Sequence, residues 1–430
     1  MRLALVNPSW TFDGSIYFGC REPHLPLELG AAKALLERAG HVAEIFDGHL
    51  FGREMADLAD DVAAFRPDAT VVATAPSYLF WRCAPPELRV PRDFLVYLGG
   101  RGGQTIAIGP HGSATPAATL RKLGCDMVLR GECEEALVEF ADAGSAENLQ
   151  GFCYRAGDTI AVNGGPRATR FTDLPALHWP DSWIARHHHH HHRFEASPVG
   201  PGAEVESSRG CPYSCSFCAK IDFRDAYRRR DLEPVLAEID GLIRQGVTYL
   251  YFIDEIFLPK RPLLEALCER PVQFGIQTRI DLWKPDMLEL LGRAGCVSIE
   301  AGVESVTEVG RDNLDKNCRM STEQLVDRLV LARRHVPFVQ ANLIKSGSDS
   351  DEDVRYWRDR LRAASVWAND PVPLFAYPSS PDYHKLFGAP DDKAWERAHA
   401  HYLSQFDRWS DIQDEEPVRL EALEETCGTR

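Results

Sequence analysis

The stretch that decides the fold is residues 208–220, which read SRGCPYSCSFCAK. It places Cys211, Cys215 and Cys218 with three and then two residues between neighbours, directly after a predicted strand. Tetrahedral zinc normally takes four Cys or His ligands, and no fourth candidate stands at zinc-like spacing. A cubane cluster has four irons, so three thiolates leave one iron open for chemistry. The spacing therefore favours a [4Fe–4S] cluster over a zinc site or structural cysteines.

The second half of the chain alternates strand and helix signals around this loop. Helical spacing is present at residues 232–246 and 321–335, between apolar runs of strand length. Six segments, most of them apolar, predict parallel strands: residues 204–208, 249–257, 272–280, 297–305, 338–347 and 366–377. Six parallel strands with intervening helices predict an α/β fold, a (β/α)6 partial TIM barrel, whose sites form at the carboxyl ends of the strands.

The first half repeats the alternation with continuous apolar strands. They are predicted at residues 3–9, 41–47, 69–80, 105–112 and 126–132. This pattern predicts a doubly wound parallel sheet of Rossmann type.

Composition shifts divide the chain into four predicted parts. A connector rich in Pro and Gly, which also carries six consecutive histidines (His187–His192), separates the two α/β halves. The predicted boundaries are 1–145 for the Rossmann-type domain, 146–200 for the connector, 201–385 for the barrel and 386–430 for a helical tail.

The CxxxCxxC pattern after the first barrel strand resembles the radical S-adenosylmethionine (SAM) superfamily, and Phe217 before the last cysteine fits it too. The resemblance implies that Cys211, Cys215 and Cys218 hold the cluster and that SAM binds its open iron. One electron then splits SAM into methionine and a 5′-deoxyadenosyl radical.

The same resemblance assigns residues at the strand ends to the SAM site. Gly302, Glu304 and Ser305 match the GxES segment of the superfamily. The full set of expected cofactor-binding residues is Phe217, Asp254, Glu255, Arg279, Glu300, Gly302, Glu304, Ser305 and Asn342.

The N-terminal half is similar to the cobalamin-binding domain of a radical SAM subfamily, through GPHGSATP (109–116) and VLRGECEEAL (128–137). Residues 47–52 match the DxHxxG pattern, whose histidine ligates cobalt in the standard domain. Here the pattern follows the second strand instead of the first. We therefore expect His49 to be an ordinary loop histidine, and the resemblance leaves cobalamin binding open.

Two reactions are compatible with a substrate radical. Several stretches, including HHHHHHRF and YPSSPDY, resemble the radical SAM diol dehydratases of the apramycin pathway. That resemblance implies hydrogen abstraction at C4′ of an aminoglycoside such as paromamine and loss of the C3′ hydroxyl as water, with a reductant protein and an NAD(P)H reductase as partners. Glu204, Glu206 and Asp254 are then the expected catalytic residues. The alternative is a cobalamin-dependent radical SAM C-methyltransferase.

Net charge and hydropathy indicate which classes of partner the chain can have. A formal charge of −16 over 430 residues argues against nucleic acid and favours a cationic small-molecule substrate. A cluster-binding sensor without turnover would need a DNA-binding module, and no such pattern is present. No apolar run reaches the ~18 residues of a membrane helix, and the N-terminus does not resemble a signal peptide. We therefore expect a cytoplasmic protein with no membrane partner.

Overall fold

The computed structural model describes residues 1–12, 15–16, 22–77, 84–187 and 200–406. His188–His192 and the predicted tail beyond residue 406 lie outside the described residues. The chain divides into two compact units. Unit 1 comprises Met1–Leu177, Cys218–Asp225 and Phe375–Arg430, and unit 2 comprises His178–Phe217 and Ala226–Leu374. The four predicted domain boundaries stay predictions.

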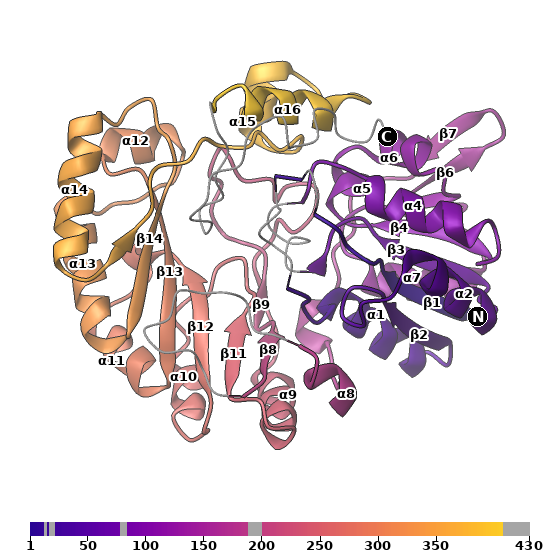
Figure 1. Ribbon diagram of the computed structural model, residues 1–430, viewed down its shortest axis with the longest axis horizontal. Coiled ribbons are helices and arrows are strands. Elements are labelled where there is room, and N and C mark those ends of the chain that lie inside the picture. The colour runs from indigo at the N-terminus through magenta and orange to yellow at the C-terminus, as the bar shows by residue number, and fades with distance from the viewer. Residues whose placement is uncertain (13–14, 17–21, 78–83, 188–199, 407–430) are drawn as a thin grey trace. The chain divides into compact units, whose positions relative to one another are not determined.

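Unit 1 is built on a seven-stranded sheet with the order β2-β1-β3-β4-β5-β6-β7 (Figure 1). The first five of these are parallel, and an antiparallel hairpin extends the sheet beyond β5. The strands are β1 (Arg2–Asn7), β2 (Val42–Asp47), β3 (Ala69–Ala73), β4 (Gln104–Ile108), β5 (Met127–Leu129), β6 (Phe152–Ala156) and β7 (Thr159–Val162). The strand order reverses between β1 and β3, as in a doubly wound fold, so the predicted fold class is confirmed.

Helices pack against both faces of this sheet. Leu58, Val62 and Phe94 from the helices on one face pack with Val6 and Val72 of the strands. Three helices end at a glycine in the left-handed region, which an L side chain would strain. The helices of unit 1 are α1 (Leu27–Arg38), α2 (Met55–Phe65), α4 (Arg89–Leu98), α5 (Pro110–Ala114), α6 (Pro116–Leu123), α7 (Glu134–Ala143), α15 (Pro381–Phe387) and α16 (Ala394–Leu403), with the short η1 (Phe171–Asp173).

Unit 2 is a six-stranded parallel sheet with the order β15-β14-β13-β12-β11-β8. Its strands are β8 (Gly202–Val205), β11 (Tyr249–Phe252), β12 (Gln273–Thr278), β13 (Cys296–Glu304), β14 (Phe338–Leu343) and β15 (Trp367–Ala368). Figure 1 shows most of the longer helices of this unit on one side of the sheet. They are α8 (Asp181–Ile184), α9 (Leu232–Arg244), α10 (Arg261–Leu267), α11 (Pro285–Arg293), α12 (Glu308–Asn313), α13 (Thr322–His335) and α14 (Asp351–Ala363), with η2 (Ile280–Leu282). The predicted partial barrel is confirmed.

Most of the strands are shorter than the runs that predicted them, and two show why. The run 366–377 gives only β15, because Pro371 and Pro373 follow and lack the N–H that a ladder needs. The run 105–112 ends as a strand at Ile108. Gly109 then adopts a φ of +121°, and the chain turns directly into α5.

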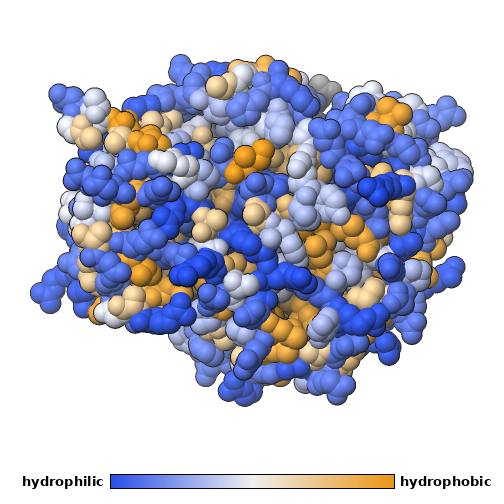
Figure 2. Space-filling model, turned by 180° about the vertical axis from the view of Figure 1, so that it is seen from behind, coloured by the Kyte–Doolittle hydropathy of each residue, from blue (hydrophilic) through white to orange (hydrophobic). Residues whose placement is uncertain are grey.

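The surface is dominated by hydrophilic residues. On the face shown in Figure 2, apolar residues gather in small separate patches. Large exposed apolar side chains, such as Val96, Val309 and Tyr356, come from different helices. Within the described residues, no helix has both the length and the apolar composition needed to cross a membrane.

Candidate active site

The cysteines lie in a loop that starts at Gly210 and is fixed at its base. β9 (Ser208–Arg209) precedes the loop and pairs antiparallel with β10 (Arg228–Arg229). The backbone N–H of Gly210 donates to Glu255 Oε2 at 2.7 Å, and that of Ser216 donates to Leu314 O at 3.0 Å. Glu255, predicted at the SAM site, therefore holds the start of the cysteine loop in place.

The loop cysteines differ from most other described cysteines in exposure. Cys211, Cys215 and Cys218 are partly exposed, whereas four cysteines outside the loop are buried: Cys125, Cys133, Cys153 and Cys296. Burial raises the pKa of Cys125 to about 12 and that of Cys153 to about 11, so these two thiols stay protonated. Among the cysteines that the structure describes, only those of the loop combine three accessible sulfur donors, which is the donor set a cubane cluster needs.

Two cationic side chains and one carboxylate act on Cys215. Burial raises the pKa of the Cys215 thiol, Lys316 and Arg279 lower it, and Glu304 raises it. Lys316 is buried and its Nζ donates to Glu304 Oε1 at 3.2 Å. Positive charge near a thiol favours the thiolate, which is the form that ligates iron. The residues at this position therefore fit an iron–sulfur cluster.

Lys316 was not predicted from the sequence. It follows α12 in a turn whose neighbours, Asp315 and Asn317, both have φ of +51°. Asp and Asn tolerate the left-handed region, so the sequence signals a turn there. Lys316 itself lies in that turn and not at the end of a strand, so the strand-end pattern did not indicate it.

Arg279 lies at the end of β12, as predicted, and covers a residue of the cysteine loop. Its guanidinium stands 3.9 Å from the ring centroid of Tyr213. It also donates to Asp281 Oδ2 at 2.8 Å and to the backbone O of Lys316 at 2.5 Å. Arg279 therefore connects the cysteine loop to the turn that carries Lys316.

Asp254 is fully buried and accepts hydrogen bonds from the segment between β8 and β9. Its carboxylate accepts from the Ser207 N–H and the Ser207 hydroxyl, both at 2.7 Å, and from the Ser208 hydroxyl. Burial raises its pKa, and Lys260, with Nζ 4.0 Å away, lowers it. This geometry positions the start of the cysteine loop. A catalytic or SAM-binding role of Asp254 stays a prediction.

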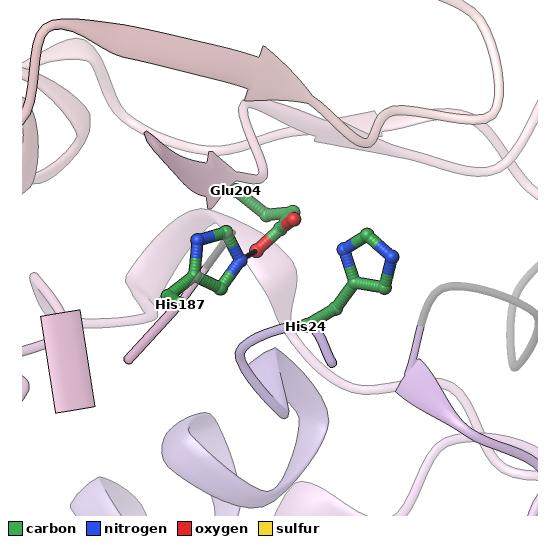
Figure 3. A group of neighbouring side chains, drawn as sticks. All are labelled: His24, His187 and Glu204. Carbon is green, nitrogen blue, oxygen red and sulfur yellow. Dashed lines mark ion pairs between the residues drawn. The ribbon is translucent and has the colours of Figure 1, made fainter. Parts of the chain in front are cut away.

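Glu204 and Glu206 each lie next to a buried nitrogen-bearing side chain. Glu206 accepts from Arg209 Nη2 at 2.8 Å. Glu204, within β8, has Oε2 2.7 Å from His187 Nε2, and both side chains are buried (Figure 3). His187 is therefore the one residue of the histidine run that the described structure places, and Glu204 is its neighbour.

The remaining predicted residues lie near the ends of β13 and β14. A Cβ at Gly302 would stand 2.5 Å from Glu304 Oε1, and Glu304 has a φ of +68° where the ladder register shifts. Ser305 donates to Asp349 Oδ1 at 2.7 Å, and Asn342 Oδ1 accepts from Gln340 Nε2 at 2.5 Å. These are local contacts, so the predicted SAM contacts of these residues, and those of Phe217 and Glu300, are not tested.

In unit 1, the DxHxxG pattern follows β2, as expected. The Asp47 carboxylate accepts from Asn7 Nδ2 at 2.9 Å and from the Leu50 N–H at 2.7 Å. A Cβ at Gly48 would stand 2.3 Å from Ser9 Oγ. The aspartate and glycine of the pattern therefore shape their own loop, which is consistent with a loop role for His49.

The histidine of GPHGSATP is also structural. His111 is fully buried, and its Nε2 donates to Pro85 O at 2.8 Å. Its ring lies 4.3 Å from that of Trp395 on α16. Burial lowers the pKa of His111 to about 3, so it stays neutral and fixes the loop after β4.

Two buried polar atoms at the switch point of this sheet lack a hydrogen-bond partner. They are Ser9 Oγ, after β1, and Glu28 Oε2, in the first turn of α1. Glu28 Oε1 accepts from Ser77 Oγ, after β3, at 2.8 Å. Buried polar atoms are normally paired, and ligands of doubly wound sheets bind at this crevice. The amides at the edge of a corrin ring both donate and accept, so these residues fit cobalamin.

The segment that carries the cysteine loop matches a known protein family. Residues 205–359 match the radical SAM superfamily. They form a radical SAM domain. Its cofactors are a [4Fe–4S] cluster and SAM, and its span includes Cys211, Cys215 and Cys218, as predicted.

Two curated proteins resemble most of the chain around the radical SAM domain. The anaerobic magnesium-protoporphyrin IX monomethyl ester cyclase of Cereibacter sphaeroides is 27% identical over 399 residues, 86% of this chain and 60% of the relative. The hopanoid C-3 methylase of Methylococcus capsulatus is 26% identical over 391 residues, 85% of this chain and 68% of the relative. The chain thus spans less than two thirds of the cyclase.

A solved structure shares the fold of this chain over the radical SAM domain and beyond it. The radical SAM methyltransferase TsrM from Kitasatospora setae, with cobalamin and a [4Fe–4S] cluster bound, superposes with a TM-score of 0.71 at 17% identity. The superposition covers 90% of this chain and 79% of TsrM. The fold is therefore that of cobalamin-dependent radical SAM enzymes.

Proposed function

We propose that this chain is a cobalamin-dependent radical SAM enzyme that transfers a methyl group to a carbon atom of a small-molecule substrate. The observation that carries the proposal is that one chain has both features: an accessible three-cysteine loop, and buried polar atoms without a hydrogen-bond partner at the switch point of the N-terminal sheet. The names of the methylase and of TsrM support methyl transfer over dehydration.

The residues of unit 2 prepare the site for reductive cleavage of SAM. When bound, the cluster supplies one electron to SAM, which splits into methionine and a 5′-deoxyadenosyl radical. Lys316 and Arg279 favour the thiolate of Cys215, and Glu255 fixes the start of the cysteine loop. Glu255 thus positions the loop, and the two cations offset part of the rise that burial causes in the pKa of Cys215.

The residues of unit 1 would hold the methyl carrier. When bound, cobalamin supplies the methyl group that is transferred. Glu28, Ser77 and Ser9 present polar atoms at the carboxyl edge of the sheet, where they can pair with amide groups of the ring periphery. Burial raises the pKa of Glu28 to about 7, so its carboxyl group can donate as well as accept near neutral pH.

Diol dehydration of an aminoglycoside is the second candidate, and one observation favours it. His187 Nε2 lies 2.7 Å from Oε2 of Glu204, which is on the first barrel strand, and these two buried groups can exchange a proton, as loss of water requires (Figure 3). This reaction needs no cobalt.

The test is anaerobic turnover of the full chain with SAM carrying a trideuterated methyl group, a reductant, hydroxocobalamin and paromamine. Methyl transfer predicts 5′-deoxyadenosine together with a product that has gained one trideuterated methyl group. Loss of one water, independent of cobalamin, would replace the proposal with dehydration. Cys215→Ala is the control, because it should form neither product.

A further inference from the structure

The segment that begins with the third loop cysteine packs within unit 1. Cys218–Asp225 belongs to the same compact unit as Phe375–Arg430, although the two are far apart in the sequence. Within the segment, the N–H groups of Phe223 and Arg224 donate to Lys220 O at 3.0 and 2.8 Å, so the chain turns there. These hydrogen bonds fix the shape of the turn, and its position in the unit depends on contacts from outside the segment.

A serine from the C-terminal part of unit 1 contacts this segment beside the cysteine. Ser379 Oγ donates to Ala219 O at 3.1 Å, and Ala219 directly follows Cys218 in the chain. Ser379 is buried, so water competes little for this hydrogen bond. The contact therefore fixes the backbone next to a predicted iron ligand.

Charge acts on the same segment from two further elements of unit 1. Burial raises the pKa of the Asp222 carboxyl group, and Arg130 and His384 lower it. Positive charge therefore faces Asp222 from the loop after β5, which carries Arg130, and from α15, which carries His384. Ser379 and His384 both belong to the C-terminal part of the unit, which therefore acts on the segment at two points.

The C-terminal part of unit 1 is itself anchored. Ser380 is the N-cap of α15, and its Oγ accepts from the Tyr383 N–H at 3.1 Å. Arg397 of α16 donates to the Tyr383 hydroxyl at 2.9 Å. Trp395 of α16 donates to Thr115 Oγ1, between α5 and α6, at 3.1 Å. The hydroxyl that contacts the cysteine segment is therefore on a residue that directly precedes a capped and anchored helix.

We propose that Ser379 is a positioning residue for the iron–sulfur cluster: its hydroxyl holds the backbone beside Cys218, so that the C-terminal part of unit 1 sets the position of the third iron ligand. The motif YPSSPDY (377–383), which contains this serine, then contributes to cluster retention. The inference goes beyond the proposed function, because the cluster is needed whichever reaction follows the cleavage of SAM.

The test is the anaerobic transfer of iron from the reconstituted full chain to the chelator ferrozine, followed by the absorbance of the iron complex. Ser379→Ala should speed cluster loss about fivefold, the usual effect of losing one hydrogen bond, because release of Cys218 opens the cluster to the chelator. Ser379→Thr keeps the hydroxyl and should lose iron more slowly than Ser379→Ala. Thr70→Val is the matched control, because the buried Thr70 hydroxyl donates to Gly102 O at 2.6 Å within unit 1 but away from the cysteines.

Hydrogen exchange of the full chain without cluster gives a second measurement. The amides of residues 219–225 should exchange faster in Ser379→Ala than in wild type, and at the wild-type rate in Thr70→Val. Unchanged exchange of this segment in Ser379→Ala, or iron loss at the wild-type rate, would overturn the inference. Equal acceleration of iron loss by Thr70→Val would also overturn it, because the effect would then follow general stability. The proposed function fails separately, on the identity of the reaction products.

Discussion

The sheets of the two units arise from the same strand–helix alternation but differ in how their faces are used. In unit 1, β3 is buried at all five residues, and helices pack on both faces. In unit 2, most of the longer helices lie on one face of the sheet (Figure 1), and the other face, here called the inner face, is lined by Glu204, Gln277 and Glu300.

The difference shows where each sheet can carry chemistry. A sheet covered on both faces has no side chains left for a ligand except at its carboxyl edge, where Ser9, Glu28 and Ser77 lie. A sheet covered on one face can use both its edge and its inner face. In this chain the edge carries the cysteine loop and the inner face carries polar acceptors.

The largest expected effect is at the edge of the barrel sheet. Cys215→Ser should reduce 5′-deoxyadenosine formation below about 1% of wild type, because the cluster needs three thiolates. Iron content and chromatography of the products measure it. Cys268→Ser, at an exposed cysteine, is the control and should leave both unchanged. Full activity of Cys215→Ser would remove Cys215 from the ligand set.

The edge of the N-terminal sheet should show a pH dependence of stability. Burial raises the pKa of Glu28 from 4.5 to about 7. The folded state therefore binds the proton more tightly, and stability should fall as pH rises from about 4.5 to about 7. Glu28→Gln should remove this fall and gain up to about 3 kcal/mol over wild type at pH 8 in urea unfolding.

Glu37→Gln is the matched control, because Glu37 is exposed on the same helix. Parallel pH profiles for wild type and Glu28→Gln would show that Glu28 titrates normally.

The inner face of the barrel can be probed with Gly275→Ala. The new Cβ would stand 2.3 Å from the Tyr249 hydroxyl, so we expect a loss of about 2 kcal/mol in the free energy of unfolding. Adding Tyr249→Phe removes that oxygen and should restore part of the loss. A double-mutant cycle measures the coupling, and strict additivity would contradict the contact.

The smallest expected effects are the stability changes of two substitutions, one in each sheet. Val71→Thr places an unpaired hydroxyl in a sheet that is buried on both sides and should cost about 1 kcal/mol. Gln277→Leu replaces an unpaired buried oxygen and should stabilise by up to about 1 kcal/mol. Thermal unfolding distinguishes the two signs. Equal losses would mean that the inner face is packed like the N-terminal sheet.

Much of the fold could be predicted from sequence because buried parallel strands are continuous apolar runs. The runs at 41–47 and 249–257 contain β2 and β11. The cysteine spacing predicted the cluster loop for a similar reason, since the ligands are close in sequence. Strand ends were less certain where Pro371 and Gly109 stop a ladder within an apolar run.

The polar inner face and the surroundings of Cys215 could not be predicted in this way. Within YLYF, Tyr249 and Tyr251 face one side and Leu250 and Phe252 the other, but the run scores as uniformly apolar. Gln277 and Glu300 become neighbours only when β12 pairs with β13. Lys316 reaches Glu304 from a turn twelve residues further along the chain. Such contacts depend on tertiary packing, which strand-end patterns do not encode.

The most direct test of the central claim is electron paramagnetic resonance of the reduced, anaerobically reconstituted full chain before and after addition of SAM. A [4Fe–4S] cluster held by three cysteines predicts about four irons and four sulfides per chain and a cluster signal whose g-values shift when SAM binds the open iron. Protein that takes up zinc in place of iron, or a cluster signal that SAM leaves unchanged, would contradict it.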